Sequence, residues 1–141
     1  MINRILFATD FSPMTRRAEQ YALSFAKAQG AKVTILHAIE PVEGAEDDSA
    51  LNAFFDARKD RAAADCELVV ARFKEAGVDA EARIELGKRW KTISDLSADN
   101  AYDLVVLGSH KIHDGNKVYV STTTHKVFFS ADVPLLVVPS N

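Results

Sequence analysis

Apolar residues gather along the chain in short runs that polar or glycine-containing segments separate. Four of these runs are nearly continuous, which is typical of strands buried on both faces of a parallel sheet, and they cover 4–9, 33–38, 104–107 and 133–139. A fifth segment, 78–86, alternates apolar and polar side chains, and this pattern predicts a half-buried strand at a sheet edge. The hydrophobic pattern therefore predicts five strands.

Helical spacing follows the first of these runs. Ser12 suits a helix N-cap, Pro13 suits the first helical position and Gly30 supplies a stop, so we predict a helix over 13–29. Its buried face is expected to contain the apolar residues that recur at spacings of three and four, namely Met14, Ala18, Tyr21, Phe25 and Ala28.

Three further helices are predicted, over 51–76, over 87–98 and from Ser121 onward. An exposed acidic loop over 40–49 precedes the first of them, and a polar loop over 108–120 precedes the last. Because strands and helices alternate, the predicted class is α/β, with a doubly wound five-stranded parallel sheet and helices on both faces. At 141 residues, of which 48% are hydrophobic, we expect a single domain over 1–141.

Charge and cysteine content narrow the classes of partner. A formal charge of −3 and a pI near 5.8 give no basic face for a run of phosphates, so nucleic acid is not expected as a partner. Cys66 is the only cysteine, which excludes an intramolecular disulfide. Residues 1–10 hold only a short apolar run, so we expect no signal peptide, no membrane partner and a cytoplasmic location.

Ligands of doubly wound sheets bind beyond the carboxyl ends of the strands. The candidate walls of a site are therefore the loops over 8–13, 38–40 and 108–117, together with the helix start at 121–124. His110 and His113 lie three residues apart in the third of these loops. That loop supplies no cysteine or carboxylate at ligand spacing, so we expect no metal.

Four motifs at the predicted strand ends carry a family resemblance. They are Ala8-Thr-Asp-Phe-Ser12, Leu36-His37-Ala38, Asp103-Leu-Val-Val-Leu-Gly-Ser-His110 and Val133-Pro-Leu-Leu-Val-Val-Pro139. In this order and spacing, the chain resembles the universal stress protein family from end to end. The resemblance implies strand order 3-2-1-4-5 and a homodimer. We expect its contacts to centre on the C-terminal strand, because an edge strand is normally covered or paired.

Many members of that family bind ATP through a glycine, two residues, a second glycine, nine residues and a third glycine followed by serine or threonine. Here Gly108 is the first glycine, Lys111 and Ser121 stand at the other two positions, and Thr122 keeps the hydroxyl. Glycine lets the backbone approach phosphates closely, so its loss weakens the cradle. The hydroxyls and N–H groups of 121–124 still favour an anion. ATP is thus a candidate ligand, and no cofactor is required.

The resemblance also assigns positions to individual residues. Asp10 matches a carboxylate that faces the nucleoside, although it can equally cap the turn at Ser12. Ala38 matches the residue whose backbone meets the adenine, and Leu107 and Gly108 match the floor of the pocket. The candidate nucleotide-binding residues are Ala8, Thr9, Asp10, Ala38, Leu107, Gly108, His110, Lys111, Ser121, Thr122 and Thr123.

Two classes of function follow from these observations. The first is a non-enzymatic regulatory module of the stress response that acts as a homodimer and senses a nucleotide, with a protein partner that no motif identifies. The second is an ATP-binding protein with slow hydrolysis, for which no general base is recognisable. The glycine-rich and nucleophile-elbow motifs of common enzymes are missing, so we expect no enzyme. A receiver-like domain would need an acidic pair where Asp10 stands alone.

Overall fold

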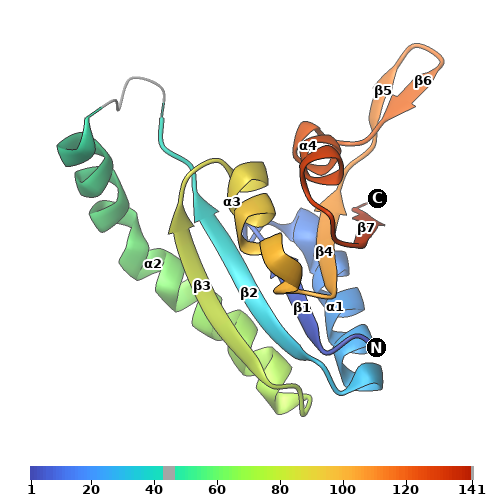
Figure 1. Cartoon of the computed structure of the whole chain (residues 1–141). Helices are drawn as coiled ribbons and strands as arrows, with labels where there is room; N and C mark the ends of the chain where they lie inside the picture. Colours follow the sequence, from blue (N-terminus) through green and yellow to red (C-terminus); the bar gives the residue numbers. More distant parts are fainter. Residues whose placement is uncertain (43–46, 141) are drawn as a thin grey trace.

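A computed structural model describes residues 1–42 and 47–140 of the chain. Its centre is a five-stranded parallel sheet in the order β3-β2-β1-β4-β7 (Figure 1). The strands are β1 (Arg4–Ala8), β2 (Lys32–Ile39), β3 (Ala80–Leu86), β4 (Leu104–Ser109) and β7 (Leu135–Pro139). The predicted fold class and strand order are confirmed, since β7 is the fifth predicted strand. Residues 43–46 of the predicted acidic loop lie outside the described residues.

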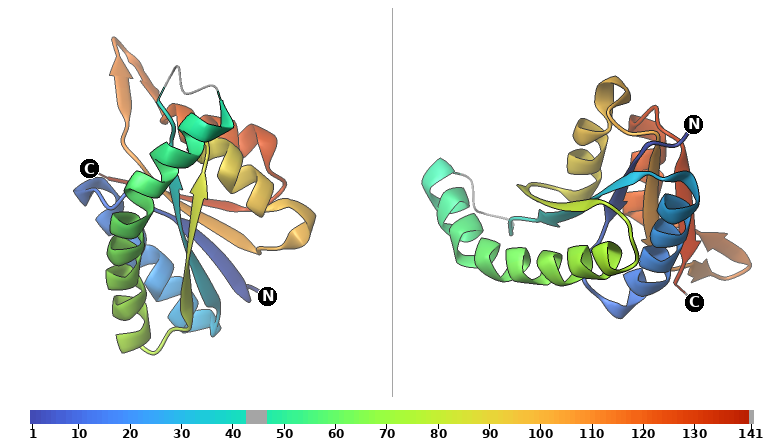
Figure 2. Two further views of the ribbon diagram at one scale, coloured as in Figure 1. Left: turned by 90° about the vertical axis from the view of Figure 1, so that its left-hand side faces the viewer. Right: turned by 90° about the horizontal axis from the view of Figure 1, so that it is seen from below.

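Helices cover both faces of the sheet, as Figure 2 shows. One face carries α1 (Arg16–Gln29) and α2 (Asp48–Glu75), and the other carries α3 (Arg89–Leu96) and α4 (Thr122–Ser130). None of the described helices is long and apolar enough to cross a membrane. The arrangement brings the first turns of α3 and α4 to the end of the sheet where the parallel strands finish, which positions the site described below.

The side chains of β1 divide between two cores. Ile5 and Phe7 belong to the core under α1 and α2, where Phe73 is fully buried. Leu6 belongs to the core under α3 and α4, together with Ile93. Because successive residues of a strand point to opposite faces, a strand covered on both sides must be apolar throughout. This explains the continuous apolar runs in the sequence.

The first helix differs from its prediction. Residues 13–15 form a separate 3-10 turn, η1 (Pro13–Thr15), and α1 starts only at Arg16. The Ser12 side chain makes no capping hydrogen bond at the start of this turn. The buried face consists of Ala18, Ala22 and Ala26, whereas Met14, Tyr21, Phe25 and Ala28 are exposed. At Ala18 a small side chain is required, because α1 and η1 approach β4 closely at Gly108 and a larger residue would not fit.

The predicted polar loop over 108–120 contains a hairpin. Its strands are β5 (Ile112–Asp114) and β6 (Lys117–Tyr119), joined by Gly115 and Asn116. Gly115 has a φ of 60°, as the first residue of a type II′ turn requires. Gly-Asn between two strands is a recognised hairpin pattern, but these strands are only three residues long, partly polar and exposed throughout, so the hydrophobic pattern does not indicate them. The hairpin projects from the body at the end of β4 (Figure 1).

The other predicted boundaries lie within three residues of the observed ones, and the largest difference is the start of α2 at Asp48, inside the predicted loop over 40–49. Ala62, Cys66 and Phe73 share the buried face of α2, and most positions of β3 at the sheet edge are partly or fully exposed. The predicted break after α3 is the 3-10 turn η2 (Ala98–Asn100), in which Asp99 and Asn100 have positive φ angles of 58° and 57°. Aspartate and asparagine tolerate this left-handed backbone better than most residues.

Candidate functional site

A cavity of about 240 Å3 lies between the carboxyl ends of β1 and β4 and the first turns of α3 and α4. It is at the end of the sheet towards which all five strands run, the upper end in Figure 1. The predicted residues that line it are Ala8, Thr9, Asp10, Leu107, Gly108, His110, Ser121, Thr122 and Thr123. The structure adds Met14, Thr15, Arg89 and Thr124 to the lining. Loops distant in the sequence therefore meet in one cavity, as the strand order requires.

Two predicted residues lie outside this cavity. Ala38 lines a neighbouring cavity of about 380 Å3, where Phe54 and Arg58 of α2 also lie. Lys111 is exposed on the segment before β5 and is not part of the first cavity's lining. Asp10 belongs to the walls of both cavities. A ligand with two chemically different parts can therefore extend from one cavity to the other past Asp10.

The loop after β1 is held by its own hydrogen bonds. The N–H of Thr9 donates to the carbonyl of Leu36 at 2.9 Å, and the Thr9 and Thr15 hydroxyls are 2.9 Å apart. Phe11 donates its N–H to the Thr9 hydroxyl at 3.0 Å and has a φ of 63°, a strained value for a bulky residue. These contacts fix where Asp10 emerges.

Asp10 is both an Asx turn and an exposed anion at the cavity. Its Oδ1 accepts the N–H of Ser12 at 2.9 Å, so the turn-capping role is present in the structure. Burial by itself would raise the pKa of Asp10, but hydrogen bonding by Ser12 and the charge of Arg89 outweigh it and hold this pKa below its usual value. The carboxylate is therefore ionised at neutral pH and can accept hydrogen bonds from hydroxyl groups.

Ser121 acts as the N-cap of α4. Its hydroxyl lies 3.0 Å from that of Thr124 and accepts the Thr124 N–H at 3.4 Å. The N–H of Ser121 donates to the Ser109 hydroxyl at 3.2 Å. This main-chain group is thus engaged with the end of β4 rather than presented to the cavity. The hydroxyl-bearing residues Thr122 and Thr123 line the cavity beside it.

Gly108 is explained by packing. A Cβ at this position would lie 3.2 Å from the Met14 carbonyl oxygen, 3.4 Å from the Thr15 Cα and 3.5 Å from the Ala18 Cβ. The first two are backbone atoms that cannot turn aside. The glycine therefore lets η1 lie against β4, a role that the sequence motif does not reveal.

Arg89 is the charged residue among those that the structure adds to the cavity lining. It is the first residue of α3, it is half-buried, and its N–H donates to Glu40 Oε1 at 2.9 Å. The predicted site included the loops after the first, second and fourth strands but not the loop after the third. In strand order 3-2-1-4, however, the chain must cross from β3 over β2 and β1 to β4, so α3 starts beside the same cavity. That crossing was the pattern that could have identified Arg89.

Two further residues with reactive side chains, His37 and Cys66, contact or lie buried among other protein groups. The Nδ1 of His37 lies 2.9 Å from the Thr9 carbonyl, and the His37 ring packs against Phe11 with centroids 4.5 Å apart. Burial raises the pKa of the Cys66 thiol to about 11, so the buried side chain stays protonated. Within 1–42 and 47–140, no three His, Cys, Asp or Glu side chains gather in a metal-binding group.

Comparison with known sequences gives a consistent family. A sequence model described as the universal stress protein family matches residues 1–139. A curated relative from Thermus aquaticus is described as a universal stress protein in the QAH/OAS sulfhydrylase 3' region. It is 29% identical over 140 residues, which cover 98% of this chain and 99% of the relative.

Solved structures share the fold over nearly the whole chain. The hypothetical protein MJ0577 has a TM-score of 0.82 at 21% identity, with 99% of this chain and 96% of that chain covered. A universal stress protein in complex with cAMP has a TM-score of 0.70 at 20% identity, with 99% of both chains covered. An Arabidopsis thaliana member with AMP bound has a TM-score of 0.69 at 17% identity, covering 99% and 92%. At these identities, the likeness establishes the architecture.

Proposed function

The chain belongs to the universal stress protein family, and from this premise we propose that it is a non-enzymatic regulatory protein that binds an adenine nucleotide and acts as a homodimer. The observation that carries the nucleotide proposal is the pair of adjoining cavities that share Asp10. One is lined by Ala38, at the position that the family resemblance gives to adenine. The other is lined by the hydroxyls at the start of α4, where the helix dipole favours an anion.

Asp10 is the proposed contact to the sugar. Two hydroxyls of a ribose can donate to an ionised carboxylate, and the depressed pKa of Asp10 keeps it in the accepting form. Relatives of the same fold support the ligand class, because one is described in complex with cAMP and another with AMP bound. Both of those ligands carry a single phosphate.

A triphosphate fits this chain less well than a monophosphate. Lys111 and Ser121 place a Cβ where ATP-binding relatives have glycine, and the Ser121 N–H already donates to Ser109. The β- and γ-phosphates therefore lose the main-chain donors that a glycine loop provides. We propose weak or undetectable ATP binding and clearer binding of AMP.

The proposal that no reaction is catalysed rests on Asp10, the one carboxylate among the described residues that line the cavity. A general base needs a pKa near the working pH, and that of Asp10 lies below even the ordinary carboxylate value. An ionised carboxylate of such low basicity is a poor base for activating water. We therefore expect no ADP or phosphate above background when the protein is incubated with ATP and Mg²⁺.

Titration calorimetry with adenosine and AMP tests the nucleotide site. Asp10→Asn keeps an oxygen for the Ser12 N–H but removes the charge, and we expect it to weaken adenosine binding by about tenfold or more, the usual value of a charged hydrogen bond. Asp95→Asn on the exposed side of α3 makes the same charge change away from the cavity and should leave binding unchanged. If the wild type binds neither ligand at millimolar concentration, the nucleotide proposal is wrong.

The homodimer proposal rests on the edge strand β7. Val105 and Ser109 of β4 bond to the main chain of Pro134 and Ser140, so the alternating peptide groups of Leu135 and Val137 face away from the sheet. Such groups can pair with a second copy of the same strand, antiparallel across a two-fold axis.

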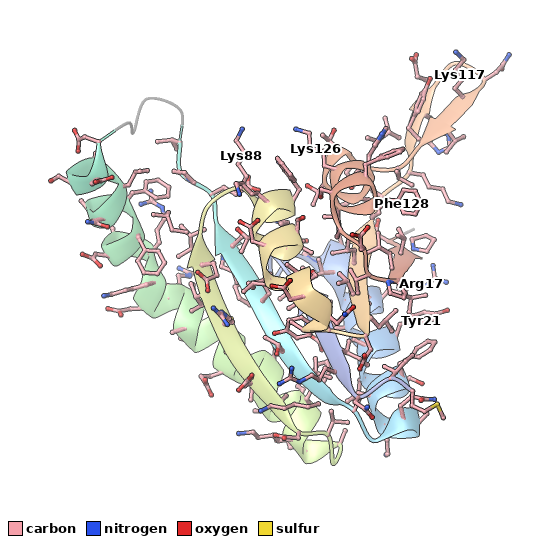
Figure 3. The ribbon with its side chains drawn as sticks, viewed as in Figure 1. Arg17, Tyr21, Lys88, Lys117, Lys126 and Phe128 are labelled. Atoms are coloured by element: carbon pink, nitrogen blue, oxygen red, sulfur yellow. The ribbon has the colours of Figure 1, made fainter. Side chains whose placement is uncertain are left out.

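Apolar side chains border this edge on both layers. Phe128 of α4 is 66% exposed and Tyr21 of α1 is 42% exposed, and Figure 3 places them on the same side of the molecule as β7. Arg17 Nη1 donates to the Pro139 carbonyl at 3.0 Å, which caps the end of the strand.

The proposed cytoplasmic location agrees with a lone buried thiol, Cys66, in place of disulfides.

A further inference from the structure

Arg89 brings a positive charge into the cavity from α3, the helix that packs beside α4. It lines the cavity together with Asp10 and Ser121–Thr124, and it comes from the first turn of a different helix. The residue as a whole is partly buried in the wall of the cavity. Charge-assisted hydrogen bonds are stronger in a partly buried site than in open water, so a cation in this wall favours an anionic ligand.

The carboxylates nearest to Arg89 are occupied by main-chain donors. Glu40 accepts the N–H of Arg89 itself, and Asp10 accepts the N–H of Ser12. Neither forms an ion pair within 4.0 Å of the Arg89 guanidinium among the described residues, whereas Arg72 and Arg83 each have a carboxylate at 2.7 Å. Arg89 still lies close enough to Asp10 to lower the pKa of that carboxyl.

Two further positive charges, Lys88 and Lys126, lie at the same end of the molecule as the cavity (Figure 3). Lys88 precedes Arg89, and Lys126 of α4 has its Nζ 5.4 Å from the ring centroid of Trp90. Figure 3 shows Lys88 and Lys126 at the end of the molecule where the strands finish. These two charges outside the cavity attract an anion from solution, and Arg89 is the cation that lines the cavity itself.

We infer that Arg89 binds the phosphate attached to the ribose of the bound nucleotide and makes this cavity selective for phosphorylated adenosine. The inference rests on the proposed nucleotide site, with Asp10 at the sugar. Because Arg89 and Asp10 line the same cavity and interact electrostatically, the phosphate within reach of Arg89 is the one next to the sugar. A guanidinium presents a planar pair of donors that matches two phosphate oxygens.

This role gives Arg89 a consequence for ligand choice. The first phosphate gains a charged partner, while the second and third find no glycine loop, because the Ser121 N–H is engaged with Ser109 and Lys111 lies outside the cavity. AMP should therefore bind more tightly than adenosine, and ATP should gain little over AMP. In this chain an arginine from α3 takes over part of the task that the glycine loop performs in ATP-binding relatives.

Calorimetry with adenosine, AMP and ATP on four proteins tests the inference. Wild type should bind AMP at least tenfold more tightly than adenosine. Arg89→Ala should remove this preference and leave adenosine binding unchanged, and Arg89→Lys should restore part of it because it returns the charge without the planar donors. Lys91→Ala removes a charge from the exposed side of the same helix and should behave as wild type. Thermal unfolding of each variant without ligand verifies that the fold is kept.

The outcomes separate this inference from the proposal beneath it. If adenosine and AMP bind equally, or if Arg89→Ala keeps the preference for AMP, Arg89 does not bind the phosphate although the nucleoside site stands. If Arg89→Ala weakens adenosine and AMP alike, Arg89 acts by positioning Asp10 and the inference is wrong. If neither ligand binds the wild type, the nucleotide site fails and the inference fails with it.

Discussion

Substituting Gly108 by alanine separates a packing role from a phosphate-binding role. The added Cβ would lie 3.2 Å from the Met14 carbonyl oxygen, which is closer than ordinary van der Waals contact. It would lie 3.4 Å from the Thr15 Cα, which is the lower limit of ordinary contact. These are main-chain atoms of η1, so relief requires η1 to move away from β4. Overpacking of this kind costs about 1–3 kcal/mol, and we expect the free energy of unfolding to fall by that amount.

Urea unfolding followed by circular dichroism measures this change in the absence of any ligand. Met14→Ala is the matched background, because it removes a side chain but leaves the carbonyl that the new Cβ meets. Gly108→Ala should therefore destabilise the Met14→Ala protein as much as the wild type. A Gly108→Ala protein with unchanged stability but lost nucleotide binding would refute the packing explanation and return Gly108 to the phosphate-binding motif.

Three further predictions concern the edge strand, the loop and pH. Val137→Pro removes an outward N–H of β7 and should turn the dimer into a monomer in light scattering. Val137→Thr keeps this N–H and should remain dimeric. A wild type that is monomeric at micromolar concentration contradicts the proposed dimer. Lys111→Gly with Ser121→Gly should tighten ATP binding by about tenfold, or 1.4 kcal/mol, and calorimetry that shows no gain contradicts the degenerate-loop interpretation. The lowered pKa of Asp10 contributes stability that is fully present above its usual value of 3.8 and disappears as the pH falls through the folded-state pKa. Acid unfolding of Asp10→Asn should therefore depend less on pH in that range than acid unfolding of the wild type.

The architecture could be predicted from the sequence because each strand and helix carries a local pattern. The run over 104–107 is apolar at every position since both faces of β4 are covered, and that requirement is visible without the structure. The face of α1 was not predictable in the same way. The bulky residues Tyr21 and Phe25 fit a helical hydrophobic pattern, yet the small Ala18, Ala22 and Ala26 face the sheet, and Ala18 lies against Gly108 where α1 approaches β4.

The candidate site was predictable as far as it lies at strand ends. Asp10, Gly108 and Ser121 follow or begin elements whose order places them together, and the structure brings them to one cavity. Arg89 was not predictable by motif, because its place depends on the path of α3 across the sheet rather than on its neighbours in the sequence. Lys111 was predicted to belong to the site because it matches a motif position. It lies outside the cavity because the chain turns outward there into the β5–β6 hairpin.

A crystal structure of the protein grown with saturating AMP shows whether an adenine nucleotide binds across the two cavities that meet at Asp10. We expect electron density for adenine beside Ala38, for the ribose against the Asp10 carboxylate, and for the phosphate between Arg89 and the first turn of α4. Crystals that contain no AMP in either cavity, or that hold it against another surface, would contradict the account.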